Sequence, residues 1–165
     1  MTNRIQKPDF FIDIFLQPGE FYFSDKETRI RTLLGSCIAI TLWHPRLQIG
    51  GMCHYLLPGH PLDNRTDLDG RYAYDVIALF MRELEITHTK PSDYVVKIFG
   101  GGNQFPNQLQ KGHANVPDKN IEIGRSLLKQ HGFIIKAEHL GGTGHRNVIF
   151  DIWSGEVWIR HVAKL

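Results

Sequence analysis

Residues 33–59, LLGSCIAITLWHPRLQIGGMCHYLLPG, contain both cysteines of the chain together with His44 and His54. Two apolar stretches rich in β-branched residues, CIAITLW (37–43) and IGGMCHYLL (49–57), flank the short polar segment HPRL. Pro45 favours a turn there and donates nothing to a strand ladder. The pattern predicts an antiparallel hairpin, and Pro58-Gly59 marks its end.

The register of this hairpin decides whether a thiol meets an imidazole. With a four-residue loop from His44 to Leu47, Trp43 pairs with Gln48 and Cys37 falls opposite His54. Directly opposed residues share a face of the sheet, with Cβ atoms about 4.5 to 5.5 Å apart. Cys53 then faces Ile38 on the other side. A loop longer or shorter by one residue would turn His54 away from Cys37.

A cysteine beside a histidine is suited to nucleophilic attack on a carbonyl carbon. An adjacent imidazolium lowers the pKa of a thiol by several units, which makes the sulfur nucleophilic at pH 7. Gly35 and Ser36, just before Cys37, leave room for a substrate and offer backbone N–H groups to a developing oxyanion.

Two other interpretations of these residues stay open. Free cysteine is among the most buried residue types, so Cys37 and His54 also fit an ordinary sheet core, and Cys53 is expected there. Zinc is a further alternative, with Cys37, Cys53, His54 and His60 as ligands. Cys53 and His54 are consecutive in a strand, however, so they point to opposite faces, and no metal is expected.

Length and composition narrow the class of protein. The 165 residues fit one domain, 1–165, that folds without disulfides, and a net charge of +2 with scattered basic residues indicates no nucleic-acid partner. The apolar run FFIDIFL (10–16) is short and contains Asp13, so neither a signal peptide nor membrane insertion is expected. We therefore expect a cytoplasmic protein whose two cysteines remain thiols.

The remaining segments predict a layered α+β fold. The first strand pair is expected at 10–16 and 21–24 around Pro18-Gly19, and a helix from Arg71 to about Leu84 with Asp69 as a possible cap. A second helix is expected from Asn120 to His131, ended by Gly132. Further strands are predicted at 94–99, 133–140, 147–153 and 157–162. This order gives a sandwich of mostly antiparallel or mixed β-sheet with two main helices packed on it.

Several motifs together resemble one family. LLGSCIAITLWHP followed by GGMCHYLLPG is similar to the Leu-Gly-Ser-Cys and Gly-Gly-Met-x-His strands of the CheD family of chemoreceptor glutamine deamidases. The segments RYAYDVIALFMREL, KIFGGGNQF and IGRSLLKQHGFIIKAEHLGGTGHRNVIFDIWSGEV extend the resemblance over about residues 18–160. It implies the CheD, or cysteine-hydrolase-like, fold.

The resemblance also implies a function and a site. It implies a protein-glutamine glutaminase that converts selected glutamines on the cytoplasmic helices of chemoreceptors to glutamate, without a cofactor, and that has a CheC-type phosphatase as a possible partner. Cys37 takes the position of the nucleophile and His54 that of the base. Arg146, in the turn GGTGHR, is a candidate for the mouth of the site.

A threonine upstream of the cysteine is the third member of the family's site, and here it corresponds to Thr32. Five residues separate Thr32 from Cys37, whereas even spacing on one strand face would select Arg31. A β-bulge at Gly35 is one way to bring Thr32 to the face of Cys37.

Two other functions remain as alternatives to the deamidase. The first is a binding module that regulates a CheC-type phosphatase or a receptor, with chemistry incidental. The second is a cysteine peptidase that uses the same dyad to cleave the chain.

Overall fold

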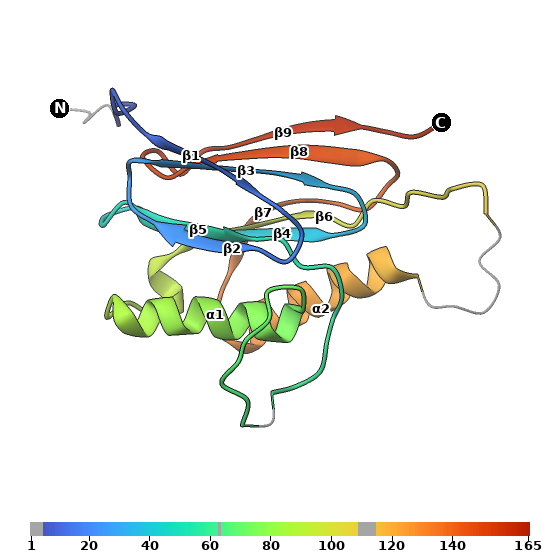
Figure 1. The fold of residues 1–165 in the computed structure, drawn as a ribbon, viewed down its shortest axis with the longest axis horizontal. Helices are drawn as coiled ribbons and strands as arrows, with labels where there is room; N and C mark the ends of the chain where they lie inside the picture. The colour runs from blue at the N-terminus through green and yellow to red at the C-terminus, as the bar shows by residue number, and fades with distance from the viewer. Residues whose placement is uncertain (1–4, 63, 109–114) are drawn as a thin grey trace.

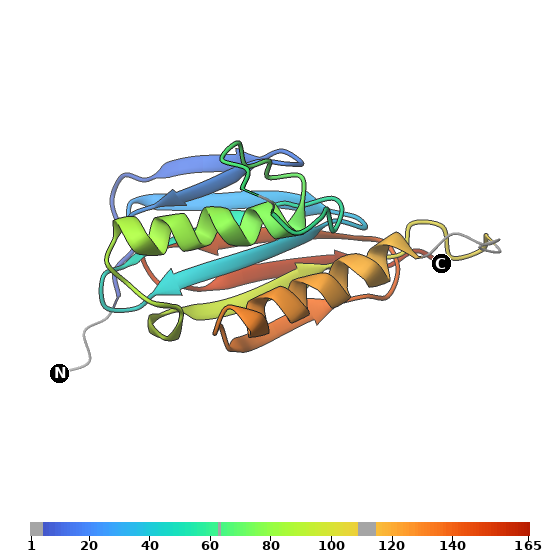
Figure 2. The ribbon, with the colours of Figure 1, turned by 90° about the horizontal axis from the view of Figure 1, so that it is seen from below.

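Two β-sheets stack face to face, and two helices cover the outer face of one of them (Figure 1). The computed structural model describes residues 5–62, 64–108 and 115–165. The four-stranded sheet has the order β1-β3-β8-β9, and the five-stranded sheet has the order β2-β5-β4-β6-β7. Figure 2 shows both helices lying across the same face of the five-stranded sheet. The predicted layered α+β sandwich with two main helices is confirmed.

The elements follow one another in the order expected from the sequence, with shifted ends. Their bounds are β1 Ile12–Leu16, β2 Phe21–Ser24, β3 Thr28–Leu34, β4 Ile38–His44, β5 Ile49–Cys53, α1 Ala73–Ile86, a 3₁₀ turn Pro91–Asp93, β6 Val95–Gly100, α2 Val116–Gln130, β7 Ile135–Leu140, β8 His145–Asp151 and β9 Val157–Val162.

Both sheets are mixed. In the four-stranded sheet β1 and β3 are parallel, and in the five-stranded sheet β6 and β7 are parallel, while the other neighbouring strands are antiparallel. Each sheet therefore contains one parallel pair at an edge.

The predicted first strand pair is wrong. β1 and β2 form at the expected places, but β1 pairs with β3 in one sheet and β2 pairs with β5 in the other. The turn at Pro18-Gly19 carries the chain from the four-stranded sheet to the five-stranded sheet instead of closing a hairpin. Turn signals fix where a strand ends, but they do not fix which strand becomes its neighbour.

The hairpin between β4 and β5 forms, with a register two residues from the predicted one. His44 pairs with Ile49 and Trp43 with Gly50, so the loop runs from Pro45 to Gln48. His44 stays in the strand, its ring nitrogen accepts from the amide of Leu47 at 3.1 Å, and Gln48 takes a positive φ of 51°. Because the shift is even, every side chain keeps its predicted face.

The ends of the two helices also differ from the prediction. Asp69 does not cap α1; its carboxylate accepts from Arg71, and the residue that caps the helix, Tyr72, has no side-chain capping bond. Helix α2 begins at Val116, before the predicted start, and Asn115 caps it. Gly132 follows α2 with a φ of 86°, as expected for a glycine after a helix.

Two apolar cores result from this layering. One lies between the helices and the five-stranded sheet, and the other lies between the two sheets. Cys53 belongs to the first core, whereas Cys37 packs against the second. The two cysteines thus lie on opposite faces of the five-stranded sheet, as the alternation of side chains predicts.

Candidate active site

Thr32 and His54 meet at one end of the layer between the sheets, and Cys37 lies on the same face of the five-stranded sheet as His54. Thr32 lies on β3 of the four-stranded sheet, and His54 directly follows β5 of the five-stranded sheet. Cys37 directly precedes β4, in the segment that crosses from one sheet to the other. The site therefore takes residues from both sheets. Thr32 and His54 are 22 residues apart in the sequence.

A hydrogen bond joins the two sheets here. Thr32 Oγ1 lies 2.7 Å from His54 Nδ1 and 2.9 Å from the carbonyl oxygen of Leu16. The hydroxyl has one proton, which it donates to the Leu16 carbonyl, so its oxygen accepts from the Nδ1–H of His54. Neutral His54 therefore carries its proton on Nδ1 and leaves Nε2 with a free lone pair.

The odd spacing between Thr32 and Cys37 needs no β-bulge. Because β3 and β4 belong to different sheets, the two residues do not share one strand, and the even-spacing rule does not apply to them. Thr32 points inward from the four-stranded sheet and is 1% exposed, whereas Arg31 points outward and pairs with Asp13 at 2.8 Å. The placement of Thr32 against His54 is thus decided by sheet stacking.

Cys37 and His54 share a face of the five-stranded sheet at diagonal positions. Ile38 pairs with Tyr55, so the residues before them, Cys37 and His54, both turn toward the layer between the sheets. Diagonal neighbours of an antiparallel pair lie about 7 to 8 Å apart, a separation that an aromatic or long side chain can span. The predicted direct opposition is wrong, but the predicted shared face is right.

Burial favours the neutral form of both side chains. It lowers the pKa of His54 to about 4 and raises the pKa of the Cys37 thiol, against which the Ser36 hydroxyl acts in the opposite direction. At neutral pH the free protein therefore holds a thiol and an uncharged imidazole. The expectation that an imidazolium lowers the pKa of Cys37 is wrong in direction for this resting state.

The segment Gly35–Cys37 is held by its carbonyl oxygens. The amides of Gly102 and Gly101 donate to the carbonyls of Gly35 and Cys37, each at 3.0 Å. Between them, the side chain of Asn120 donates from Nδ2 to the carbonyl of Ser36 at 3.3 Å. The backbone around the thiol is thus fixed from the loop after β6 and from helix α2.

Asn120 is a residue that sequence reasoning missed. It is fully buried on α2, and its side chain also donates to the carbonyl of Leu56 at 2.7 Å, while its backbone carbonyl accepts from the Tyr55 hydroxyl at 2.6 Å. A signal was present, because Asn120 shares the apolar stripe of the helix with Gly124 and Leu127. A polar residue in such a stripe indicates a buried hydrogen-bonding role.

Arg146 lies beside the site but does not open onto it. The residue is 1% exposed, and its guanidinium donates to the carbonyls of Gly100 at 3.3 Å and Gly141 at 2.6 Å and to His139 Nδ1 at 2.8 Å. Burial lowers its pKa from the usual value. The predicted place at the mouth of the site is therefore wrong, and Arg146 supports the glycine loop instead.

The four residues of the zinc alternative do not gather. Cys53 faces the helices, Cys37 and His54 face the other sheet, and His60 is exposed in the loop after the hairpin. Within residues 5–62, 64–108 and 115–165 no group of three or more metal-binding side chains is found.

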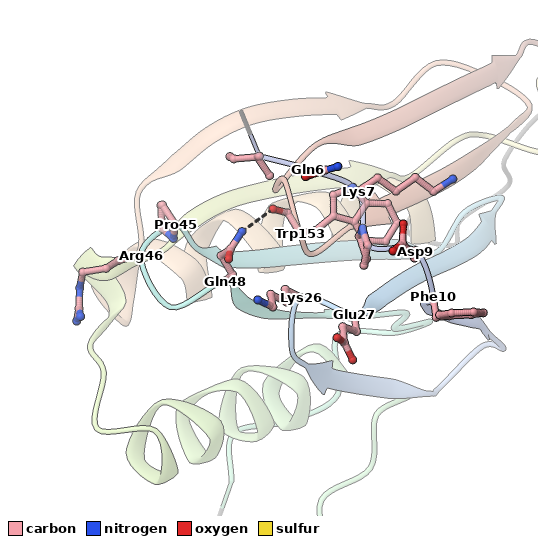
Figure 3. Close-up of a pocket in the computed structure, with 12 residues that line it drawn as sticks. Gln6, Lys7, Asp9, Phe10, Lys26, Glu27, Pro45, Arg46, Gln48 and Trp153 are labelled. Atoms are coloured by element: carbon pink, nitrogen blue, oxygen red, sulfur yellow. Dashed lines mark hydrogen bonds between the residues drawn. The ribbon is translucent and has the colours of Figure 1, made fainter. Parts of the chain in front are cut away.

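A cavity lies at the other end of the hairpin (Figure 3). It measures about 910 Å³ and is lined by the N-terminal segment, by Lys26 and Glu27 before β3, by the β4–β5 turn and by Trp153. Gln48 donates to the carbonyl of Trp153 at 2.8 Å across its wall. Because Cys37 stands at the opposite end of β4, this cavity is separate from the Thr32–His54 pair.

No helix in the described part of the chain is long and apolar enough to span a membrane.

Comparisons with known proteins agree on one family. The profile of CheD, described as CheD chemotactic sensory transduction, matches residues 56–161. A protein of Pseudomonas syringae pv. tomato is 46% identical over 95% of this chain and 94% of its own length. One of Dechloromonas aromatica is 43% identical over 92% and 89%. Their names are "Probable chemoreceptor glutamine deamidase CheD" and "Probable chemoreceptor glutamine deamidase CheD 3".

Among solved structures, the hypothetical protein YfiH of Bacillus licheniformis superimposes with a TM-score of 0.47 and 14% identity, covering 72% of this chain and 49% of that one. The profile match covers well over half of the sequence, and the curated relatives cover nearly all of it. The chain belongs to the CheD family.

Proposed function

We propose that this protein is a chemoreceptor glutamine deamidase, which hydrolyses glutamine side-chain amides of receptors to glutamate with Cys37 as nucleophile. The observation that carries the proposal is the hydrogen bond between Thr32 and His54, which leaves Nε2 of a buried histidine unprotonated on the face that Cys37 shares. The names of relatives that are 43% to 46% identical over most of the chain support the substrate class.

The first half of the reaction forms a thioester. As the glutamine binds, the Cys37 thiol gives its proton to Nε2 of His54, and the thiolate sulfur bonds to the amide carbon while the carbonyl π electrons move to oxygen. The oxyanion returns its electrons as the carbon–nitrogen bond breaks, and the His54 imidazolium protonates the departing nitrogen. Ammonia leaves, and the substrate is held as a Cys37 thioester.

The second half releases glutamate. His54, now neutral, takes a proton from water, whose oxygen attacks the thioester carbon. The carbon–sulfur bond breaks, the sulfur is reprotonated from His54, and the product is a carboxylic acid that ionises. Thr32 keeps the imidazole in the tautomer that this cycle needs, since its oxygen accepts from Nδ1 throughout. Neither metal nor cofactor enters the balance.

A receptor assay tests this function. The purified protein is incubated with a soluble fragment of a chemoreceptor cytoplasmic domain, and glutamine-to-glutamate conversion is followed by peptide mass spectrometry. We expect conversion by the wild-type protein and none by Cys37→Ala. Conversion that persists in Cys37→Ala would refute the assignment, and cleavage of the fragment would instead favour a cysteine peptidase.

The setting of the reaction is a further part of the proposal. Because the proposed substrate lies on receptor cytoplasmic helices, we expect the protein to act in the cytoplasm, and family membership supports a CheC-type phosphatase as a partner. If the protein acts only as a binding module, cells carrying Cys37→Ala will show normal chemotaxis and normal partner binding.

A further inference from the structure

In the peptide unit between Ser36 and Cys37 the carbonyl is hydrogen-bonded, but the N–H is not bonded to any residue that the structure describes. Its carbonyl accepts from Asn120 Nδ2 at 3.3 Å. Among the described residues, the amide nitrogens of Gly35, Ser36 and Cys37 find no hydrogen-bond acceptor. All three carbonyls of the same segment are bonded, through Gly102, Asn120 and Gly101. In this segment the carbonyl oxygens are hydrogen-bonded, whereas the N–H groups have no acceptor among the described residues.

The direction of the vacant donor follows from peptide geometry. No peptide bond in the described chain is cis, and in a trans peptide the C=O and N–H point in opposite directions. The Ser36 carbonyl points toward Asn120 on α2, which lies on the helix side of the five-stranded sheet. The N–H of Cys37 therefore points away from the helices, toward the layer that holds His54 and the Cys37 side chain.

Within the described part of the chain, only one end of the Asn120 side chain is hydrogen-bonded. The side chain is fully buried, and its Oδ1 has no hydrogen-bond partner among the described residues. Burying an unsatisfied polar atom costs roughly 1 to 3 kcal/mol. The Nδ2 group, by contrast, donates to Ser36 before the thiol and to Leu56 after the imidazole. The side chain is used for these two donations.

The other carbonyls are held by a loop that is itself fixed. Gly100 and Gly101 have φ values of 115° and 68°, a region that suits glycine, and a Cβ on Gly100 would lie 2.1 Å from the Cys37 carbonyl oxygen. Arg146, on β8 of the four-stranded sheet, donates to the carbonyl of Gly100. The thiol segment is therefore held from two sides.

We propose that Asn120 is a positioning residue that orients the Ser36–Cys37 peptide so that the Cys37 N–H forms the oxyanion hole of the site, with the Ser36 N–H as a second donor. A donor fixed before the reaction stabilises the charge that develops on a carbonyl oxygen without reorganisation. This assignment deepens the proposed function, because it rests on acyl transfer to Cys37.

Two small probes separate this role from general support of the fold. With p-nitrophenyl acetate, the Cys37 sulfur bonds to the carbonyl carbon, the oxygen becomes an oxyanion, and p-nitrophenolate leaves with its bonding electrons. With iodoacetamide, the sulfur displaces iodide from a saturated carbon and no oxyanion forms. Both reactions need the thiolate, so the ratio of acylation to alkylation rates reports the oxyanion hole.

The variants are Asn120→Leu, which keeps the branched shape but removes the donor, and Asn120→Asp, which keeps both shape and size. The matched control is Tyr55→Phe, which removes a buried hydrogen bond to the same residue without touching Ser36. Cys37→Ala gives the background from Cys53, and thermal unfolding checks each fold. We expect Asn120→Leu to lower the ratio about 10- to 100-fold. Tyr55→Phe should leave the ratio within about twofold of wild type, since Nδ2 is unchanged.

Asn120→Asp keeps the proposal testable if the leucine variant does not fold. Its carboxyl donates to the Ser36 carbonyl when protonated and repels it when ionised, so the ratio should recover as pH falls, whereas the wild-type ratio stays flat. Equal losses in acylation and alkylation, or an unchanged ratio in both variants, would overturn the role of Asn120. Failure of receptor deamidation with a lowered ratio would overturn the proposed substrate alone.

Discussion

The two cysteines of this chain lie on opposite faces of one sheet and have different surroundings. Cys53 is fully buried among apolar residues under the helices, accepts from the amide of Ile40 at 3.3 Å, and has a pKa raised to about 12. Cys37 is partly exposed and shares its face of the five-stranded sheet with His54, which Thr32 contacts from the other sheet. Access and a proton acceptor, rather than the residue type, distinguish a candidate nucleophile from a core residue.

The largest expected effect is on activity. Cys37→Ala removes the sulfur that forms the thioester, so we expect receptor deamidation to fall by more than about 1,000-fold. Cys53→Ala is the matched variant and should keep activity within about twofold, with a loss of about 1 kcal/mol in the free energy of unfolding. Mass spectrometry of the receptor fragment and urea denaturation measure the two effects. A comparable loss of activity in both variants would remove the distinction.

The buried His54 should also make the stability of the protein depend on pH. The pKa of His54 is about 4 in the folded protein against 6.5 for an ordinary histidine. Between pH 6.5 and 4 the unfolded chain therefore binds a proton at His54 that the folded protein does not bind. The contribution of neutral His54 to the free energy of unfolding is complete above pH 6.5 and is lost as the pH falls toward 4. The loss approaches about 3 kcal/mol.

Urea denaturation at several pH values measures this dependence. The His54→Gln variant is the reference, because His139, whose pKa is also lowered, contributes in the same direction. The difference between the two proteins should shrink as pH falls through this window. Parallel curves for both proteins would show that His54 is not the group responsible.

The hydroxyl that holds His54 should have a smaller effect. Thr32→Val removes the acceptor for Nδ1–H, which frees the imidazole to take the other tautomer, and we expect kcat to fall about tenfold or more with little change in KM. Thr28→Val is the control on the same strand, since that buried hydroxyl bonds to Ser24 at 3.0 Å and not to the site. Equal kcat values for the two variants would contradict the role of Thr32.

The smallest expected effect is a shift in thiol reactivity. Because burial raises the pKa of Cys37 above the ordinary 9.0, iodoacetamide should modify it in the native protein with a midpoint above that pH, and Cys53 should not react until the chain unfolds. Peptide mass spectrometry distinguishes the two sites. Fast alkylation of Cys37 below pH 8 that His54→Ala abolishes would instead indicate a resting thiolate–imidazolium pair.

The sequence was most informative about which face of a strand each side chain occupies, because this follows from the two-residue period of a strand. The hairpin register was wrong by two residues, yet Cys37 and His54 still share a face, because the alternation of side chains repeats every two residues. The same alternation placed Cys53 on the core side. Errors in the register were harmless here only because they were even.

Local patterns were least informative where the chain changes sheets. β1 and β2 flank a clear turn signal, and β3 and β4 are separated by three residues, yet each pair is divided between the two sheets. Stacking the sheets then brings Thr32 against His54 without any regular spacing. The role of Asn120 depends likewise on a helix that meets the thiol segment 84 residues away in sequence.

The sequence by itself determined the α+β class, the places of the strands and helices, and the opposite faces of the two cysteines, because these follow from periods of 2 and 3.6 residues along the chain. Tertiary structure alone decided strand partners, the proton position on His54, the pKa directions of the thiol and imidazole, and the carbonyl contacts of Asn120. These depend on burial and on contacts between residues distant in sequence, which no local pattern encodes.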